Sequence, residues 1–132
     1  MKLEYDASKP IYEQIIDKIK KMIVRGELKP GDKLPSQRKM AKKVEVNPNT
    51  IQRAYREMEN RKLVETKRGL GTFIKKDEEI INKISEEMAN RTVEKFINEM
   101  KSLGFNEDEV LEILKNNLEK FEGGVFNGTN SK

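Results

Sequence analysis

The chain contains neither cysteine nor histidine. Without cysteine there is no disulfide framework and no thiolate nucleophile. Without histidine, the chain lacks the commonest general base and metal ligand, and it cannot form any serine–histidine or cysteine–histidine arrangement. These absences exclude much of enzymology. We therefore expect a protein that is not an enzyme, with no catalytic residues, no metal site and no cofactor.

Long apolar runs are also missing. No run approaches the ~18–20 residues that a membrane-spanning helix needs, and the first residues lack the apolar region of a signal peptide. We therefore expect a cytoplasmic protein. Its 132 residues suit one domain, or a small domain with an appendage. Charged residues make up 38% and hydrophobic ones 35%, which predicts a lean core and well solvated helices.

Charge is divided unevenly along the chain. Residues 1–76 carry 20 Lys and Arg against 10 Asp and Glu, a net charge of +10. Residues 77–132 carry 7 against 13, a net charge of −6. A unit as basic as the first should attract a polyanion, and nucleic acid is the first candidate. Scattered surface charge is the alternative interpretation.

Hydrophobic periodicity predicts a first helix in the basic half. Ser8 is a possible cap, Pro10 suits the helix start, and Gly26 suits its end. The apolar positions recur every three or four residues, as one buried helix face requires: Ile11, Ile15, Ile19, Met22 and Ile23.

Two short helices and a hairpin are predicted to follow. The second helix opens at Ser36, and the third has Asn47 as its N-cap and Pro48 in its first position. That third helix runs to about residue 60 or 61 and places Tyr55 in the core. Residues 63–67 and 72–74 read as strands joined by a turn. Three helices followed by a hairpin make a winged helix-turn-helix.

The exposed side of the third helix carries residue types that read base edges. Asn and Gln can bond adenine, Arg can bond guanine, and the Thr methyl can contact thymine. The second helix start suits phosphates, and the hairpin turn suits the minor groove. The candidate DNA-binding residues are Ser36, Arg38, Asn47, Asn49, Thr50, Gln52, Arg53, Arg56, Lys67, Arg68 and Gly69.

Each of these residues also has a purely structural interpretation. Asn47 is equally well explained as a helix cap alone. Arg38, Arg53 and Arg56 are explained as solvated charges, and Gly69 as a requirement of hairpin geometry. Composition and spacing leave both interpretations open.

Several motifs in the right order resemble one family. The segments 34–41, 46–55 and 69–74 resemble the winged helix-turn-helix of GntR-family bacterial transcription regulators. Residues 47–55, together with residues 10–15, look most like the family's small YtrA subfamily. The resemblance covers roughly residues 3–75 and implies a dimeric repressor that binds an inverted-repeat operator. It also implies control of a transporter operon, often of the ATP-driven export type.

The chain departs from the family pattern at four positions. Many members have an acidic residue where Gln37 and Lys39 stand, so the capping box at Ser36 is lost. Many have Gly at the position of Lys62, which leaves the end of the third helix less certain. Pro48 replaces a common Arg, so the operator should differ from that of Arg-bearing relatives.

Residues 77–121 are predicted to form a two-helix dimerisation unit. A long helix with one apolar stripe ends at Gly104, and a second helix begins at Asn106 with Glu109 completing a capping box. Two helices can bury such stripes only against another body, most simply a second copy. Residues 122–132 look like a flexible tail. The predicted dimer core comprises Ile84, Met88, Val93, Ile97, Met100, Leu111, Leu114 and Leu118.

The sequence thus predicts a mostly α-helical chain with one small hairpin. A winged helix-turn-helix spans residues 1–76, followed by the dimerisation unit. We expect a homodimeric, sequence-specific double-stranded-DNA-binding regulator; whether a small effector binds it stays open. The alternative is a winged-helix module that binds a protein, with incidental basic charge. Single-stranded nucleic acid is disfavoured, because the few aromatic residues fit core positions.

Overall fold

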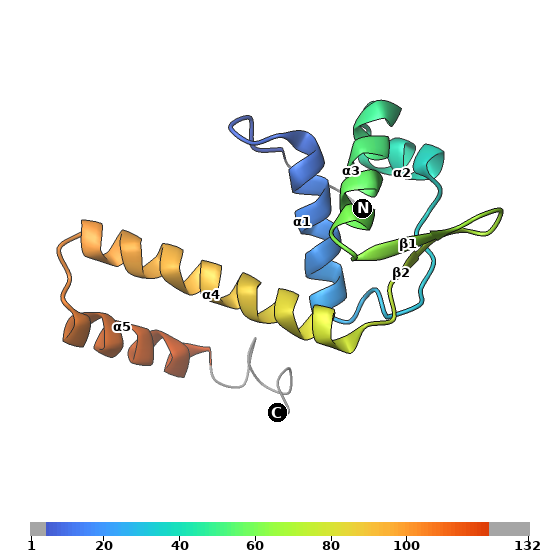
Figure 1. The fold of residues 1–132 in the computed structure, drawn as a ribbon. Helices are drawn as coiled ribbons and strands as arrows, with labels where there is room; N and C mark the ends of the chain where they lie inside the picture. The colour runs from blue at the N-terminus through green and yellow to red at the C-terminus, as the bar shows by residue number, and fades with distance from the viewer. Residues whose placement is uncertain (1–4, 122–132) are drawn as a thin grey trace. The chain divides into compact units, whose positions relative to one another are not determined.

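A computed structural model describes residues 5–121, so the predicted tail at 122–132 lies outside the described residues. The elements follow the predicted order of three helices, a hairpin and two further helices (Figure 1). This confirms the predicted fold class. The elements are α1 (Ile11–Val24), α2 (Gln37–Val44), α3 (Pro48–Asn60), β1 (Val64–Lys67), β2 (Gly71–Ile74), α4 (Glu78–Ser102) and α5 (Glu107–Lys120).

The chain divides into two compact units, Met1–Glu86 (unit 1) and Glu87–Lys132 (unit 2). This division lies within α4, further along the chain than the boundary expected at residue 76. The first two turns of α4 belong to unit 1, and Ile84 in them is only 7% exposed. Within residues 5–121, no helix is both long and apolar enough to cross a membrane.

Unit 1 has a continuous apolar core. α3 packs against α1, α2 and β1, so the core forms around the third helix. Tyr55 is 4% exposed and its hydroxyl donates to the Pro35 carbonyl at 2.6 Å, which confirms its predicted core position. Burial raises the pKa of this hydroxyl. The helical core residues are Ile15, Ile16, Ile19, Ile23, Met40, Ala41, Val44, Ile51, Ala54, Tyr55 and Met58.

The start of α1 differs from the prediction. Pro10 occupies the N-cap position and no side chain caps the helix, so the expected cap by Ser8 is wrong. The Ser8 hydroxyl instead donates to the Asp6 carboxylate at 2.6 Å. Ile11 is 42% exposed, so the apolar stripe of α1 is buried only from Ile15 onward.

The end of α3 explains the departure at Lys62. The Lys62 N–H donates to the Glu59 carbonyl and the Leu63 N–H to the Met58 carbonyl. These two bonds form a Schellman motif, which requires a left-handed residue after the cap. Lys62 adopts that conformation with a φ of +64°. The helix therefore ends without the glycine that this conformation favours.

The hairpin is held in place along its second strand by another segment of unit 1. β1 and β2 pair antiparallel, with Val64 opposite Ile74. On the other edge of β2, the Leu34 N–H donates to the Thr72 carbonyl and the Ile74 N–H donates to the Asp32 carbonyl. The segment before α2 thus supports a hairpin that would be marginal alone.

The apolar residues of α4 form two faces rather than the one expected stripe. Ile84 and Met88 are four residues apart, but five residues separate Met88 from Val93. At 3.6 residues per turn, that step rotates the apolar side by about 140°. Ile84 is buried, whereas Val93 is 52% exposed. Ile84 therefore offers little apolar surface to a partner.

The start of α5 agrees with the prediction. Asn106 accepts from the Glu109 N–H at 2.9 Å, and the Glu109 carboxylate accepts from the Asn106 N–H at 2.9 Å. This completes the predicted capping box. Gly104, with a φ of +89°, follows the end of α4 as expected.

Candidate nucleic-acid interface

Two helix caps fix the starts of α2 and α3. The Ser36 hydroxyl accepts from the Lys39 N–H at 3.2 Å, so Ser36 still caps α2 although the capping box is lost. The Asn47 side-chain oxygen accepts from the Asn49 N–H at 2.7 Å. The predicted capping role of Asn47 is therefore confirmed, while its amide NH₂ group stays available for a phosphate or base.

The two sides of α3 are sharply different. Asn49, Gln52, Arg53 and Arg56 are exposed, and Thr50 is half-buried. The opposite side of the helix lies in the core of unit 1. The predicted separation into a polar outer side and an apolar inner side is confirmed. Donors and acceptors for base edges thus stand on a helix that the core holds rigidly.

Arg53 rests on an aromatic ring from another helix. The centre of its guanidinium lies over the Tyr12 ring, 4.0 Å from the ring centroid. Asn49, Thr50 and Arg53 from α3 border one open hollow together with Pro10, Ile11 and Tyr12 from the start of α1. The start of α1 therefore lies beside the candidate base-reading residues.

The hairpin tip presents Arg68, Gly69 and Leu70 to solvent. The Leu70 N–H donates to the Lys67 carbonyl at 2.8 Å, and Gly69 has a φ of +79°. A Cβ on Gly69 would meet nothing within 4 Å, so its backbone conformation is what favours glycine here. The Lys67 ammonium lies 5.0 Å from the Phe73 ring centroid and 4.0 Å from the Glu65 carboxylate.

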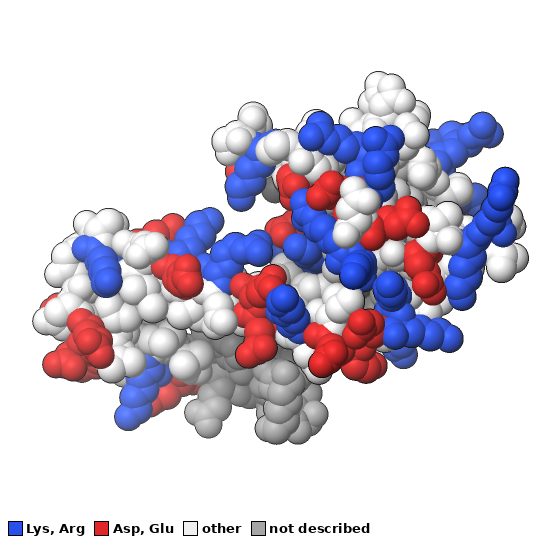
Figure 2. Space-filling model, viewed as in Figure 1, with Lys and Arg blue, Asp and Glu red and all other residues white. Residues whose placement is uncertain are grey.

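Positive charge surrounds the candidate residues. α2 contains no acidic residue, and its Arg38 and three lysines are all exposed. Lys and Arg side chains project from the region of α2 and α3 and from the hairpin tip (Figure 2). A phosphate backbone approaching this surface would meet an attractive field.

Not every arginine on α3's side of unit 1 is available to a ligand. Arg61 donates to the Glu13 carboxylate at 2.6 Å and to the Glu57 carboxylate at 3.1 Å. The hydrogen bond from Arg61 lowers the pKa of Glu13 below its ordinary value. Arg61 therefore ties α1 to the end of α3, which is a structural role.

Sequence reasoning missed two tyrosines beside this site. Tyr12 lies in the first turn of α1, and its ring supports Arg53. The Tyr5 hydroxyl donates to the Val44 carbonyl at 2.8 Å and so links the chain before α1 to the end of α2. No local signal shows which residues of α1 meet α3, because these contacts join distant positions.

Within residues 5–121, no three or more acidic side chains are placed to share a metal ion. The interface is instead built from amides, hydroxyls and guanidinium groups, which suit DNA recognition.

Comparison with known proteins gives the family. Residues 11–74 match the model of the bacterial regulatory proteins of the gntR family. The chain is 50% identical to the HTH-type transcriptional regulator YhcF of Bacillus subtilis over 112 residues, covering 85% of this chain and 93% of YhcF. It is 52% identical to the HTH-type transcriptional repressor YtrA of Bacillus subtilis over 68 residues, covering 52% of each chain.

A solved structure resembles the chain over most of its length. It is a GntR-family transcriptional regulator from Listeria monocytogenes, with a TM-score of 0.78 and 43% identity. The similarity covers 85% of this chain and 98% of that one. These matches confirm the resemblance that the motifs indicated and the assignment to a class other than enzymes. The chain belongs to the GntR family of bacterial regulatory proteins and is a DNA-binding transcription regulator.

Proposed function

We propose that this regulator is a homodimeric repressor that binds an inverted-repeat operator through α3 and the hairpin tip. The observation that carries the proposal is the exposed polar side of α3, where Asn49, Gln52 and Arg53 stand on a rigid basic unit. α3 would enter the major groove, while Arg68 would reach the adjacent minor groove. Ser36 and Arg38 would contact phosphates.

Apolar surface on unit 2 supports the dimer. None of the described residues after Glu86 is buried, and five large apolar side chains of the two helices are exposed: Val93, Ile97, Leu111, Leu114 and Leu118. A second copy offers a surface of the same chemistry, and a twofold axis would bury it on both chains. The proposed interface comprises Val93, Ile97, Met100, Leu111, Leu114 and Leu118, with a minor share for Ile84 and Met88 on the other face of α4.

A twofold dimer predicts the form of the operator. Two copies of α3 would suit half-sites about one helical turn, or ~10 bp, apart, or a multiple of that distance. We further propose, from the resemblance to the YtrA subfamily, that the operator controls an ABC-type transporter operon. The protein would act in the cytoplasm. Two helices per subunit leave little room for a buried metabolite pocket of ~300 Å³ or more.

The test is a fluorescence anisotropy titration with two duplexes at two salt concentrations. One duplex comes from the gene's own upstream region and the other is its scrambled counterpart. The proposal expects the native duplex to bind at least ~10³-fold more tightly at physiological salt. Equal binding to both duplexes, with a steep salt dependence, would reduce the proposal to nonspecific attraction. Binding to neither would favour a protein partner.

A further inference from the structure

Arg53 is held differently from Arg25 and Arg61, two other arginines of unit 1. Arg25 and Arg61 each contact a carboxylate, whereas no ion pair involving Arg53 occurs among residues 5–121. Its guanidinium carbon instead lies over the π face of Tyr12, 4.0 Å from the ring centroid. An aromatic face attracts a cation without cancelling its charge. Arg53 is thus held in place without a carboxylate partner.

The way Arg53 is held leaves its hydrogen-bonding groups free. The five N–H donors of a guanidinium point outward from its central carbon, and in Arg53 that carbon lies over the Tyr12 ring rather than beside a carboxylate. A carboxylate partner such as Glu13 on Arg61 uses those same donors. Bidentate bonding to guanine O6 and N7 needs two of them. Contact with Tyr12 is therefore compatible with base reading, whereas contact with a carboxylate would occupy some of the donors.

Tyr12 itself is anchored in the rigid part of unit 1. It lies in the first turn of α1, which packs against α3, and its neighbours Ile15 and Ile16 are buried. α1 and α3 begin on the same side of unit 1 (Figure 1). The Tyr12 ring therefore borders the open hollow beside Asn49 and Thr50 without being absorbed into the core.

We infer that Tyr12 is a positioning residue that orients Arg53 for base recognition before DNA arrives. This inference rests on the proposed function and adds a determinant of specificity to it. A free arginine loses much side-chain entropy when it binds, and holding it in place beforehand reduces that cost. Removing the ring should therefore weaken binding and reduce discrimination at the base pair that Arg53 reads.

The test begins by establishing a specific duplex. The full wild-type chain selects its preferred sequence from a random library of double-stranded DNA. Affinities are then measured by fluorescence anisotropy at one salt concentration for wild type, Tyr12→Phe, Tyr12→Leu, Arg53→Ala and Tyr12→Leu/Arg53→Ala. Failure of the wild-type chain to enrich any sequence would overturn the proposed function and this inference with it.

The variants separate a positioning role from other roles of Tyr12. Tyr12→Phe keeps the aromatic face and should bind within about twofold of wild type. Tyr12→Leu should bind about three- to fivefold more weakly. In the Arg53→Ala background, Tyr12→Leu should have no further effect. Tyr12→Leu should also lose preference at the base pair where Arg53→Ala loses it, a change that a merely structural role would not produce.

Three outcomes would overturn the inference while leaving the proposed function intact. Wild-type affinity and specificity in Tyr12→Leu would show that the ring does not matter. An equal loss in Tyr12→Phe and Tyr12→Leu would assign the effect to the hydroxyl, as a direct DNA contact. A full additional loss from Tyr12→Leu in the Arg53→Ala background would show that Tyr12 acts independently of Arg53.

Discussion

Units 1 and 2 differ in how far they bury their apolar side chains. Every described residue that is buried lies in unit 1, and the described part of unit 2 buries none. In unit 2, Val93 is 52% exposed, Leu103 70% and Leu111 58%. Unit 1 completes its core within one chain, so its surface is free to carry ligand-binding groups. Unit 2 leaves apolar side chains uncovered, as an interface with another body requires.

The substitution with the largest expected effect disrupts the proposed dimer. Ile97→Glu places a carboxylate in the apolar face of α4, and twofold symmetry places it there twice. Losing the apolar contact and burying an unpaired charge should cost more than about 4 kcal/mol per dimer. The dimer dissociation constant should therefore rise by about 1,000-fold or more, measured by sedimentation equilibrium.

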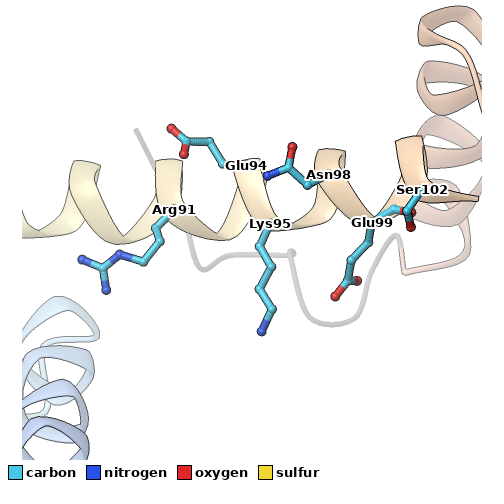
Figure 3. Close-up of a pocket in the computed structure, with 6 residues that line it drawn as sticks. All are labelled: Arg91, Glu94, Lys95, Asn98, Glu99 and Ser102. Atoms are coloured by element: carbon cyan, nitrogen blue, oxygen red, sulfur yellow. The ribbon is translucent and has the colours of Figure 1, made fainter. Parts of the chain in front are cut away.

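Asn98→Glu is the matched control. It introduces the same carboxylate one residue further along α4, where six polar or charged side chains border a shallow hollow (Figure 3). This variant should dimerise as wild type does. A stable Ile97→Glu dimer would place the interface elsewhere, and equal damage from both substitutions would mean that added negative charge alone is responsible.

Truncating a core side chain of unit 1 should lower the stability of that unit far more than a similar truncation in unit 2. Ile19 is fully buried, so Ile19→Ala should lower the free energy of unfolding of unit 1 by about 2–5 kcal/mol. Leu111→Ala removes similar atoms from unit 2 and should change unit 1 by less than about 0.5 kcal/mol. All three tyrosines lie in unit 1, so tyrosine fluorescence during urea denaturation reports on that unit alone. Equal losses would show that both units unfold together.

Local signals predicted much of the fold. Asn47 and Pro48 mark the start of α3 because caps depend on neighbouring residues, and the same holds for Asn106 and Glu109 in α5. The exposed residues of α3 followed from helical periodicity. The expected cap by Ser8 failed because its hydroxyl has a nearer partner in Asp6.

Contacts between residues far apart in the chain could not be predicted from the sequence. Tyr12 and Arg53 meet only because α1 packs on α3, and no spacing rule states which side chains then face each other. The prediction of a single stripe on α4 overlooked the five-residue step from Met88 to Val93. In a helix, a step of that length moves the apolar side chains to a different face. For Lys62, the glycine that many family members have at this position was the sign of a left-handed backbone, which the hydrogen bonds ending α3 require.

A smaller effect should come from that left-handed lysine. Lys62→Gly relieves the cost of a positive φ, partly offset by the greater freedom of glycine in the unfolded chain, and should stabilise unit 1 by about 0.5 kcal/mol. Gly26 ends α1 in the same conformation, with a φ of +80° and nothing within 4 Å of an added Cβ. Gly26→Ala should therefore destabilise by about 1 kcal/mol. Changes of the same sign in urea midpoints would contradict the interpretation.

The smallest expected effect concerns the pH dependence of unit 1. Because Arg61 lowers the pKa of Glu13 below its ordinary value of 4.5, the folded state favours the ionised carboxylate. The stabilisation is fully present above pH 4.5 and is lost as the pH falls through the lowered value. The Glu13 side chain is 36% exposed, so solvent screening limits the contribution to about 0.5 kcal/mol. Glu13→Gln should remove it.

Comparing wild type with Glu13→Gln isolates this contribution from the other carboxylates. In urea denaturation at about pH 5.5, the wild type should have the larger free energy of unfolding. The difference between the two proteins should shrink as the pH falls to about 3. Added salt should shrink the same difference at pH 5.5, because the ion pair is partly exposed. Parallel losses in both proteins would mean that the contact between Glu13 and Arg61 stabilises the packing of α1 on α3 independently of charge.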